Sequence, residues 1–194
     1  ARLDIEPKFI IINWDTKEIE LKSKNIDCIW NGLTITEKRK ANMDFTKPYL
    51  VNEQVIIIPS ADVDKYKDKA DFKGVTMVAE SGSAGQSSIE TDLPDAKVTA
   101  VDAQTKALLE VKAGTAQAAV VDATLAHTMT GAGTDYANLT VLTDFNLTSE
   151  EYAIGVRPGS TAVAELNKVT KELQQEGIMA EIAEKYGLTE RLIK

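Results

Sequence analysis

Cysteine and histidine are nearly absent from this chain of 194 residues, which contains one of each. A single cysteine, Cys28, excludes an internal disulfide framework. Because Cys28 lies within an apolar run, we expect a small core residue there rather than a nucleophile or a ligand. The lone histidine, His127, falls inside a predicted helix and is expected to be an ordinary helix residue. The sequence therefore predicts no metal site and no cofactor.

Long apolar runs and an excess of basic residues are also missing. The longest apolar run, Val55 to Pro59, is too short to span a bilayer and is expected to be a strand. The formal charge of -8 argues against nucleic acid as a partner, because phosphate backbones are bound through clusters of Lys and Arg. With 43% hydrophobic and 27% charged residues, the composition is that of a globular protein with one or two cores.

Apolar periodicity along the chain alternates between strands and helices. This β–turn–α alternation implies mostly parallel sheets covered by helices. The run at 8–13 is nearly all apolar, so we expect a strand buried on both faces, followed by a short helix to Ser23 with Ile19 facing inward. Two extended segments, near 46–58 and 144–157, join two α/β units. The pattern predicts a bilobal clamp in which residues 1–50 and 150–194 form lobe 1 and residues 51–149 form lobe 2.

Gly32, Thr34 and Arg39 stand together where the apolar run 26–30 ends and a helix is expected to begin. A hydroxyl, free backbone N–H groups and a guanidinium would then surround one small volume. Such a volume suits a carboxylate, since Arg offers a planar bidentate fork and helix N-termini favour anions. The alternative is that the threonines only cap the helix and Arg39 is solvated.

Two further polar groups follow predicted strands of the second unit. Ser83 ends a glycine-containing turn, Ser-Gly-Ser, which is a further anion-friendly turn. Asp122 directly follows the strand at 117–121 and could pair with an ammonium group, or could serve only as a helix N-cap. Two carboxylate-binding turns and one carboxylate are the complement of a free α-amino acid.

The chain resembles the amino-acid-binding proteins of ABC importers, which have a type II bilobal periplasmic-binding-protein fold. Residues 25–39 (Asn-Ile-Asp-Cys-Ile-Trp-Asn-Gly-Leu-Thr-Ile-Thr-Glu-Lys-Arg) and 44–49 (Asp-Phe-Thr-Lys-Pro-Tyr) carry the resemblance in the first lobe. It continues at 81–83, at 118–122 (Ala-Ala-Val-Val-Asp), at 152–157 (Tyr-Ala-Ile-Gly-Val-Arg) and at 176–187. These segments occur in the family's order and spacing over nearly the whole chain.

The resemblance implies a role for each matching residue. Arg39 would clamp the α-carboxylate of the ligand, with Thr34 and the Gly32 region adding hydrogen bonds. Ser83 would bind the same carboxylate from the second lobe, and Asp122 would accept the α-ammonium. Ala84 stands where many members have a second hydroxyl, so that contact is in doubt here.

Trp14 and Asn31 match positions that face the side chain of the ligand in this family. Trp14 would pack on that side chain, although it could instead be a core residue. Asn31 would line the same pocket, whereas Trp30 is expected to serve packing. An aromatic ring and an amide suggest a polar or amphipathic amino acid such as glutamine, cystine, histidine or arginine.

One departure from the family concerns the N-terminus. Members begin with a first strand and helix that this sequence lacks, which would leave the strands at 8–13 and 26–31 without their shared neighbour. Three explanations stay open: the segment is present but not included here, it has been trimmed, or a truncated chain refills the gap by swapping with another copy. The last would give a domain-swapped or other oligomer.

The implied function is capture of an amino acid without chemistry. The resemblance makes the chain the solute-binding component of an amino acid ABC transporter, located in the periplasm or lipid-anchored outside the cytoplasmic membrane. Its partners would be the amino acid and the permease subunits in the membrane. Two alternatives stay open: a ligand-sensing domain of a receptor, and a dehydratase-like enzyme in which a cleft carboxylate acts as general acid. Against the enzyme, Asp122 is already assigned to the ammonium.

Overall fold

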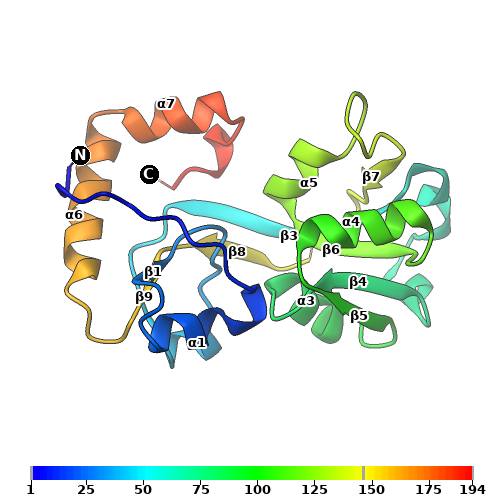
Figure 1. Ribbon diagram of the computed structural model, residues 1–194. Helices are drawn as coiled ribbons and strands as arrows, with labels where there is room; N and C mark the ends of the chain where they lie inside the picture. Colours follow the sequence, from blue (N-terminus) through cyan, green and yellow to red (C-terminus); the bar gives the residue numbers. More distant parts are fainter. Residues whose placement is uncertain (1, 146, 194) are drawn as a thin grey trace. The chain divides into compact units, whose positions relative to one another are not determined.

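The computed structural model describes residues 2–145 and 147–193, and the chain divides into two compact units (Figure 1). Unit 1 comprises Ala1–Val51 and Glu150–Lys194, and unit 2 comprises Asn52–Ser149. Strands β3 (Leu50–Pro59) and β8 (Ser149–Tyr152) contain the two points at which the chain passes between the units. Closure of the two units on a ligand, as the lobes of a clamp, stays a prediction.

Unit 2 is built on one mixed sheet. Its strand order is β5-β4-β6-β3-β7, and β8 also pairs with β3. Strand β4 (Thr76–Glu80) is parallel to β5 (Lys97–Val101) and to β6 (Ala118–Asp122). Strand β3 runs antiparallel to β6 and to β7 (Leu139–Val141). The carboxyl ends of β4 and β6 therefore share one edge of the sheet with the start of β3.

Both faces of this sheet are buried, because successive side chains of a strand point to opposite faces. On one face, Ile56, Met77 and Val120 pack against Ile89 of α3 (Ala84–Asp92). On the other face, the apolar residues of the strands pack against α4 (Gln104–Ala113) and α5 (Ala123–Met129). The two short 3-10 helices η2 (Ser60–Lys65) and η3 (Lys69–Phe72) follow β3.

Unit 1 has a small sheet of three short strands, in the order β1-β9-β2. Strand β9 (Gly155–Val156) is antiparallel to both β1 (Cys28–Ile29) and β2 (Asp44–Phe45). The expectation of parallel-rich sheets is therefore wrong for this unit and holds only for the centre of the unit 2 sheet. The chain enters unit 1 from unit 2 just before β9, and the direction of β9 is opposite to that of both neighbouring strands.

Helices of unit 1 come from both ends of the sequence. The first part contributes η1 (Trp14–Thr16), α1 (Lys17–Lys22) and α2 (Glu37–Lys40). The second part contributes α6 (Ala162–Gln175), α7 (Ile178–Lys185) and η4 (Thr189–Arg191). None of the described helices of either unit is long and apolar enough to cross a membrane.

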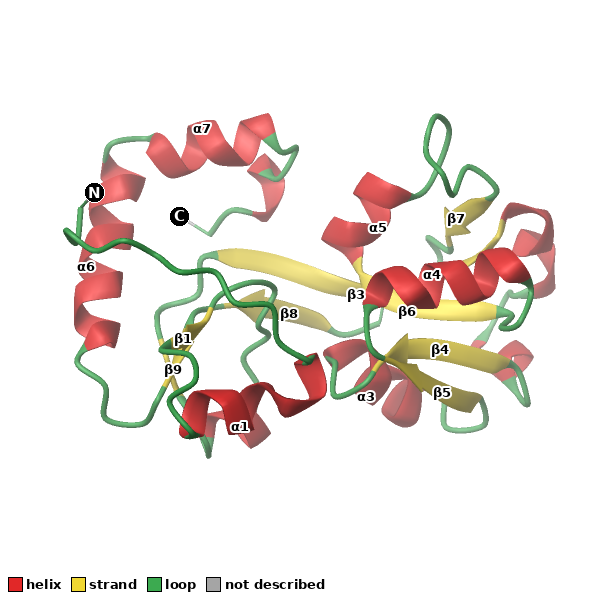
Figure 2. Cartoon of the chain, in the orientation of Figure 1, coloured by secondary structure: helices red, strands yellow, loops and turns green. Residues whose placement is uncertain are grey.

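The strand expected at 8–13 does not form. Figure 2 draws the chain before η1 as loop, Phe9 is 92% exposed, and Ile11 is fully exposed. A strand is stable only when its N–H and C=O groups pair with a neighbouring strand, and none of the described strands lies beside this segment. The segment is apolar enough for a buried strand, but composition alone does not provide a neighbouring strand with which to pair.

The side chains of Ile19 and Cys28 are less buried than the sequence predicts. Ile19, expected to face inward from α1, is 65% exposed, and Leu21 occupies the core position instead. Cys28 lies at the edge of the core and is half-buried. Burial raises the pKa of the Cys28 thiol, and the neighbouring carboxylate of Asp27 adds to this shift.

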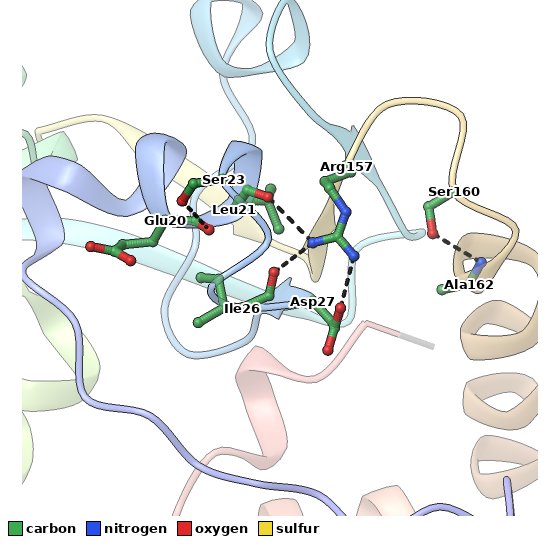
Figure 3. Close-up of polar contacts among 8 residues, drawn as sticks. All are labelled: Glu20, Leu21, Ser23, Ile26, Asp27, Arg157, Ser160 and Ala162. Atoms are coloured by element: carbon green, nitrogen blue, oxygen red, sulfur yellow. Dashed lines mark hydrogen bonds and ion pairs between the residues drawn. The ribbon is translucent and has the colours of Figure 1, made fainter.

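The side chain of Arg157 fastens the loop after α1 to the end of β9 (Figure 3). Its Nη1 donates to the carbonyl oxygens of Leu21, at 3.3 Å, and Ile26, at 2.5 Å. Its Nη2 donates to Asp27 Oδ1 at 2.7 Å. Because Leu21 lies in the last turn of α1, the guanidinium also supplies a positive charge where helix carbonyls lack intrahelical partners.

Replacing Arg157 by glutamine should lower the free energy of unfolding by about 1–3 kcal/mol, because hydrogen bonds from a charged donor to partly buried carbonyls are lost. Urea unfolding followed by circular dichroism measures the change. Arg2→Gln is the matched control: Arg2 pairs with Glu176 on the surface, where ion pairs add little stability. An equal loss in both variants would show that the Arg157 contacts do not stabilise the fold.

Candidate binding site

Arg39 is one of the few charged side chains buried in unit 1. It lies in α2, is only 6% exposed, and its Nη1 donates to the carbonyl oxygen of Thr34 at 2.8 Å. Its backbone N–H donates at 3.1 Å to the hydroxyl of Thr36, which caps the helix. The alternative of a solvated Arg39 is therefore excluded, although the threonine cap that accompanied it is present. The helix expected to begin after the apolar run 26–30 forms as the short α2, and the Arg39 side chain that it carries is buried.

The ring of Trp14 contacts two cationic side chains, those of Arg39 and Lys17. The guanidinium carbon of Arg39 is 6.0 Å from the ring centroid, and the Lys17 ammonium is 4.9 Å from it. The same ammonium donates to the carbonyl oxygen of Trp14 at 2.9 Å. Both distances fall within the range of cation–π attraction. Trp14, predicted from the sequence, and Lys17, which was not, thus belong to one cluster with Arg39.

The other predicted residues of unit 1 lie close to Arg39 in sequence but differ in exposure. Thr34 is buried and forms a β-bridge with Tyr152. Gly32 has a φ of 58°, a left-handed conformation that favours glycine. Asn31 is exposed just before that turn, and Trp30, expected to serve packing, is exposed as well. A hydrogen bond therefore connects Thr34 to Arg39 directly. Asn31 and Gly32 belong to the turn that follows β1.

Asp122 forms the corresponding polar centre of unit 2. Its Oδ1 accepts from Asn52 Nδ2 at 3.1 Å and from Gln54 Nε2 at 2.6 Å, and its Oδ2 accepts from Gln104 Nε2 at 2.6 Å. The backbone N–H of Asp122 donates to Gln104 Oε1 at 2.8 Å. We call the side chains of Asn52, Gln54 and Gln104 the amide cage. The carboxylate makes no N-cap hydrogen bond to α5, so the simple capping alternative is not what the structure shows.

The amide cage follows from the register of the sheet. Gln54 of β3 is directly opposite Asp122 of β6, and Asn52 lies two residues earlier on the same face. Gln104 is the first residue of α4, which reaches the same strand end. A carboxylate has about four acceptor sites, so three amide donors fix its orientation and leave room for one more donor.

Ser83 caps α3 beside this network. Its hydroxyl accepts from the backbone N–H of Gln86 at 3.0 Å, and its side chain is buried. Gly85, two residues further, brings the first turn of α3 against the sheet. A Cβ atom at Gly85 would lie 2.8 Å from Gln54 Oε1 and 3.0 Å from the carbonyl oxygen of Val120. The structure thus places the first turn of the helix that Ser83 caps against Gln54, which also donates to Asp122.

The amide cage and Lys17 were missed by reasoning from the sequence. Asn52 and Gln54 interrupt a strand that is otherwise mostly apolar, Leu-Val-Asn-Glu-Gln-Val-Ile-Ile-Ile. Polar residues two apart on a buried strand point to one face and must find partners there. That spacing was the available signal. Lys17 carried none, because a lysine at the start of a helix is normally solvated.

The described residues of the two units contain no cluster of metal-binding side chains. Within residues 2–145 and 147–193, no group of three or more His, Cys, Asp and Glu side chains is placed to hold a metal ion. The polar groups gathered in the two units are instead a buried guanidinium in unit 1 and an amide-held carboxylate in unit 2. These are the groups that pair with a carboxylate and with an ammonium.

Comparison with known proteins establishes the class to which the chain belongs. The sequence profile of the bacterial extracellular solute-binding proteins, family 3, matches residues 1–189. The chain is a member of this family. Likeness to solved structures of such proteins also confirms the predicted fold class, a type II bilobal α/β fold.

Particular relatives bind amino acids according to their names. The chain is 29% identical over 167 residues to the ABC transporter glutamine-binding protein GlnH of Bacillus subtilis, covering 86% of this chain and 59% of that protein. A mutant of ArgBP from T. maritima shares 32% identity with a TM-score of 0.86, covering 95% of this chain and 79% of that one. The ancestral amino acid-binding protein AncCDT-1, described as a precursor of cyclohexadienyl dehydratase, shares 26% identity with a TM-score of 0.82, covering 92% and 77%.

Gln104→Glu should test the amide cage, because it places a second carboxylate against Asp122. The substitution also replaces an amide donor to the Asp122 carboxylate by an acceptor, so we expect the free energy of unfolding to fall by about 1–3 kcal/mol.

Thr105→Glu is the matched control, since it adds the same charge one residue along α4 at an exposed position. Thermal unfolding of both variants at neutral pH provides the measurement. If Gln104→Glu were as stable as Thr105→Glu at neutral pH, the contact between Gln104 and Asp122 would not exist in solution.

Proposed function

We propose that the chain is the solute-binding component of an amino acid ABC transporter and that it captures a polar L-amino acid between its two units. Family membership supports binding of a solute outside the cytoplasm. The names of the relatives support an amino acid as that solute. Residence in the periplasm or on a lipid anchor, and docking to permease subunits in the membrane, belong to this proposal.

The charged ends of the ligand define the roles of two residues. Arg39 binds the α-carboxylate with its bidentate fork, assisted by Thr34, by the turn at Gly32 and, from unit 2, by Ser83. Asp122 accepts the α-ammonium. Trp14 packs on the ligand side chain and Asn31 borders it. Closing the units removes water from both ionic contacts, and ligand binding shifts the open–closed equilibrium by its stronger affinity for the closed form.

The observation that carries this proposal is the set of hydrogen bonds that holds the carboxylate of Asp122. Three neutral amides hold its carboxylate, and among the described residues no cationic side chain forms a salt bridge with it. Neutral donors fix the direction of the carboxylate and leave its charge for an external cation. An α-ammonium supplies that charge and donates to the remaining acceptor position.

The same arrangement supports binding rather than catalysis. A carboxylate whose two oxygens accept three hydrogen bonds from amides is held as an acceptor, whereas a general acid has to donate a proton to its substrate. A relative of the chain is named as the glutamine-binding protein of an ABC transporter. We therefore propose that the ligand leaves the site unchanged.

Replacing Arg39 by alanine should abolish amino acid binding that calorimetry can detect. The ligand carboxylate would then be desolvated without its partner, a cost of about 3–5 kcal/mol, or at least a hundredfold in affinity by the usual conversion. The ligand is first found by a thermal-shift screen with the twenty amino acids and cystine, and the affinity is then measured by titration calorimetry.

Lys38→Ala is the matched control, because Lys38 precedes Arg39 in α2 but is exposed. Its affinity should equal that of the wild type. Equal losses in the two variants would remove Arg39 from the site, and a screen without any stabilising amino acid would overturn the proposed function.

A further inference from the structure

Trp14 occupies a position in which the fold alone does little to fix its side chain. It is the first residue of the short helix η1, and the chain before it is a mostly exposed loop (Figure 2). Its ring is partly buried at the edge of the small core of unit 1. A large side chain at such an edge keeps several rotamers unless neighbouring groups hold it.

The side chain of Lys17 contacts both the backbone and the ring of Trp14. Its Nζ donates to the Trp14 carbonyl oxygen at 2.9 Å and lies 4.9 Å from the centroid of the indole ring. One ammonium group close to both keeps the ring folded toward that carbonyl group. The contact runs from the first residue of η1 to the first residue of α1, so the turn between them brings the lysine back over the ring.

Arg39 connects this pair to the proposed ligand site within unit 1. Its guanidinium carbon is 6.0 Å from the centroid of the Trp14 ring. A ligand whose α-carboxylate binds Arg39 would therefore have the Trp14 ring within reach of its side chain. The orientation of that ring then decides how much of the ligand side chain the ring can cover.

We infer that Lys17 is a positioning residue for ligand binding: it holds the indole of Trp14 in the orientation that receives the ligand side chain. This inference rests on the proposed function, because it needs Trp14 to pack on the ligand. Lys17 acts through the ring and does not have to touch the ligand. The attraction between an ammonium and the face of an indole holds the ring, together with the hydrogen bond to the carbonyl oxygen.

A lysine at this place has a cost that its contacts with Trp14 offset. Lys17 is the first residue of α1, and the helix dipole disfavours a cation at a helix N-terminus. Its side chain is also buried, which is rare for lysine and removes rotamer freedom. A leucine could occupy the position without the cost of the charge. It could not donate to the carbonyl oxygen or attract the ring through a charge.

The first test follows the mobility of the indole without a ligand. The chain has two tryptophans, so Trp30→Phe leaves Trp14 as the only source of indole fluorescence. In that background, time-resolved fluorescence anisotropy reports how freely the ring moves. Lys17→Ala should increase the amplitude of the fast motion of the ring. Lys17→Arg should restore the wild-type amplitude, because a guanidinium also donates and stacks on aromatic rings.

Lys22→Ala is the matched control, because Lys22 lies at the exposed end of the same helix. It should leave the motion of the ring unchanged. If Lys17→Ala left the motion unchanged as well, the inference would be overturned. Lys17→Leu, which keeps an apolar side chain without charge or donor, gives the same comparison if the alanine variant fails to fold.

The second test asks whether this orientation serves ligand binding. The probe is whichever of the twenty amino acids and cystine binds most tightly, and titration calorimetry of the whole chain measures its affinity. Lys17→Ala should weaken binding about fivefold, the usual size of a cation–π contact, and Lys17→Arg should restore most of the affinity. In a Trp14→Leu background, Lys17→Ala should cause no further loss, because the ring through which the lysine acts is gone.

The outcomes separate this inference from the proposed function. An equal loss from Lys17→Ala with and without the Trp14 ring would overturn the inference, since the lysine would then act without the ring. An unchanged affinity in a folded Lys17→Ala variant would overturn it too, while amino acid binding stands. If no amino acid binds the wild-type chain, the proposed function fails and the inference fails with it.

Discussion

A charge removed from water has to be held by oriented dipoles or by an opposite charge, and this requirement shapes both units. In unit 2 the carboxylate of Asp122 is held by amides from β3 and α4. In unit 1 the guanidinium of Arg39 is held by a backbone carbonyl and an indole ring. Each arrangement fixes the direction of the charged group before a ligand arrives, which reduces the ordering cost of binding.

The amide cage also explains the close packing around it. Gln54 has to reach Asp122 across the sheet, and the first turn of α3 passes directly over Gln54. Only a glycine at position 85 leaves room for the amide, because a Cβ atom there would come within 2.8 Å of its oxygen. The orientation of Asp122 thus depends on a residue in a different element.

Most of unit 2 could be predicted from the sequence, and parts of unit 1 could not. The apolar runs at 117–121 and 55–59 predicted strands, and β6 and β3 cover these positions apart from residue 117. The segment at 8–13 has equally clear apolar character, yet a strand needs a neighbour that residue types alone do not supply. Arg39, Thr34 and Asp122 could be proposed as site residues because their chemistry is visible in the sequence. Lys17 and the amides were missed because their importance lies in what they contact.

The half-buried thiol of Cys28 has a practical consequence for work on this protein. It is the only cysteine in the sequence, and its raised pKa keeps it protonated at neutral pH, when only the thiolate attacks a maleimide dye. A cysteine introduced at an exposed position of unit 2 would therefore react ahead of it. The natural sequence already serves as a nearly silent background for attaching one fluorophore at a chosen place.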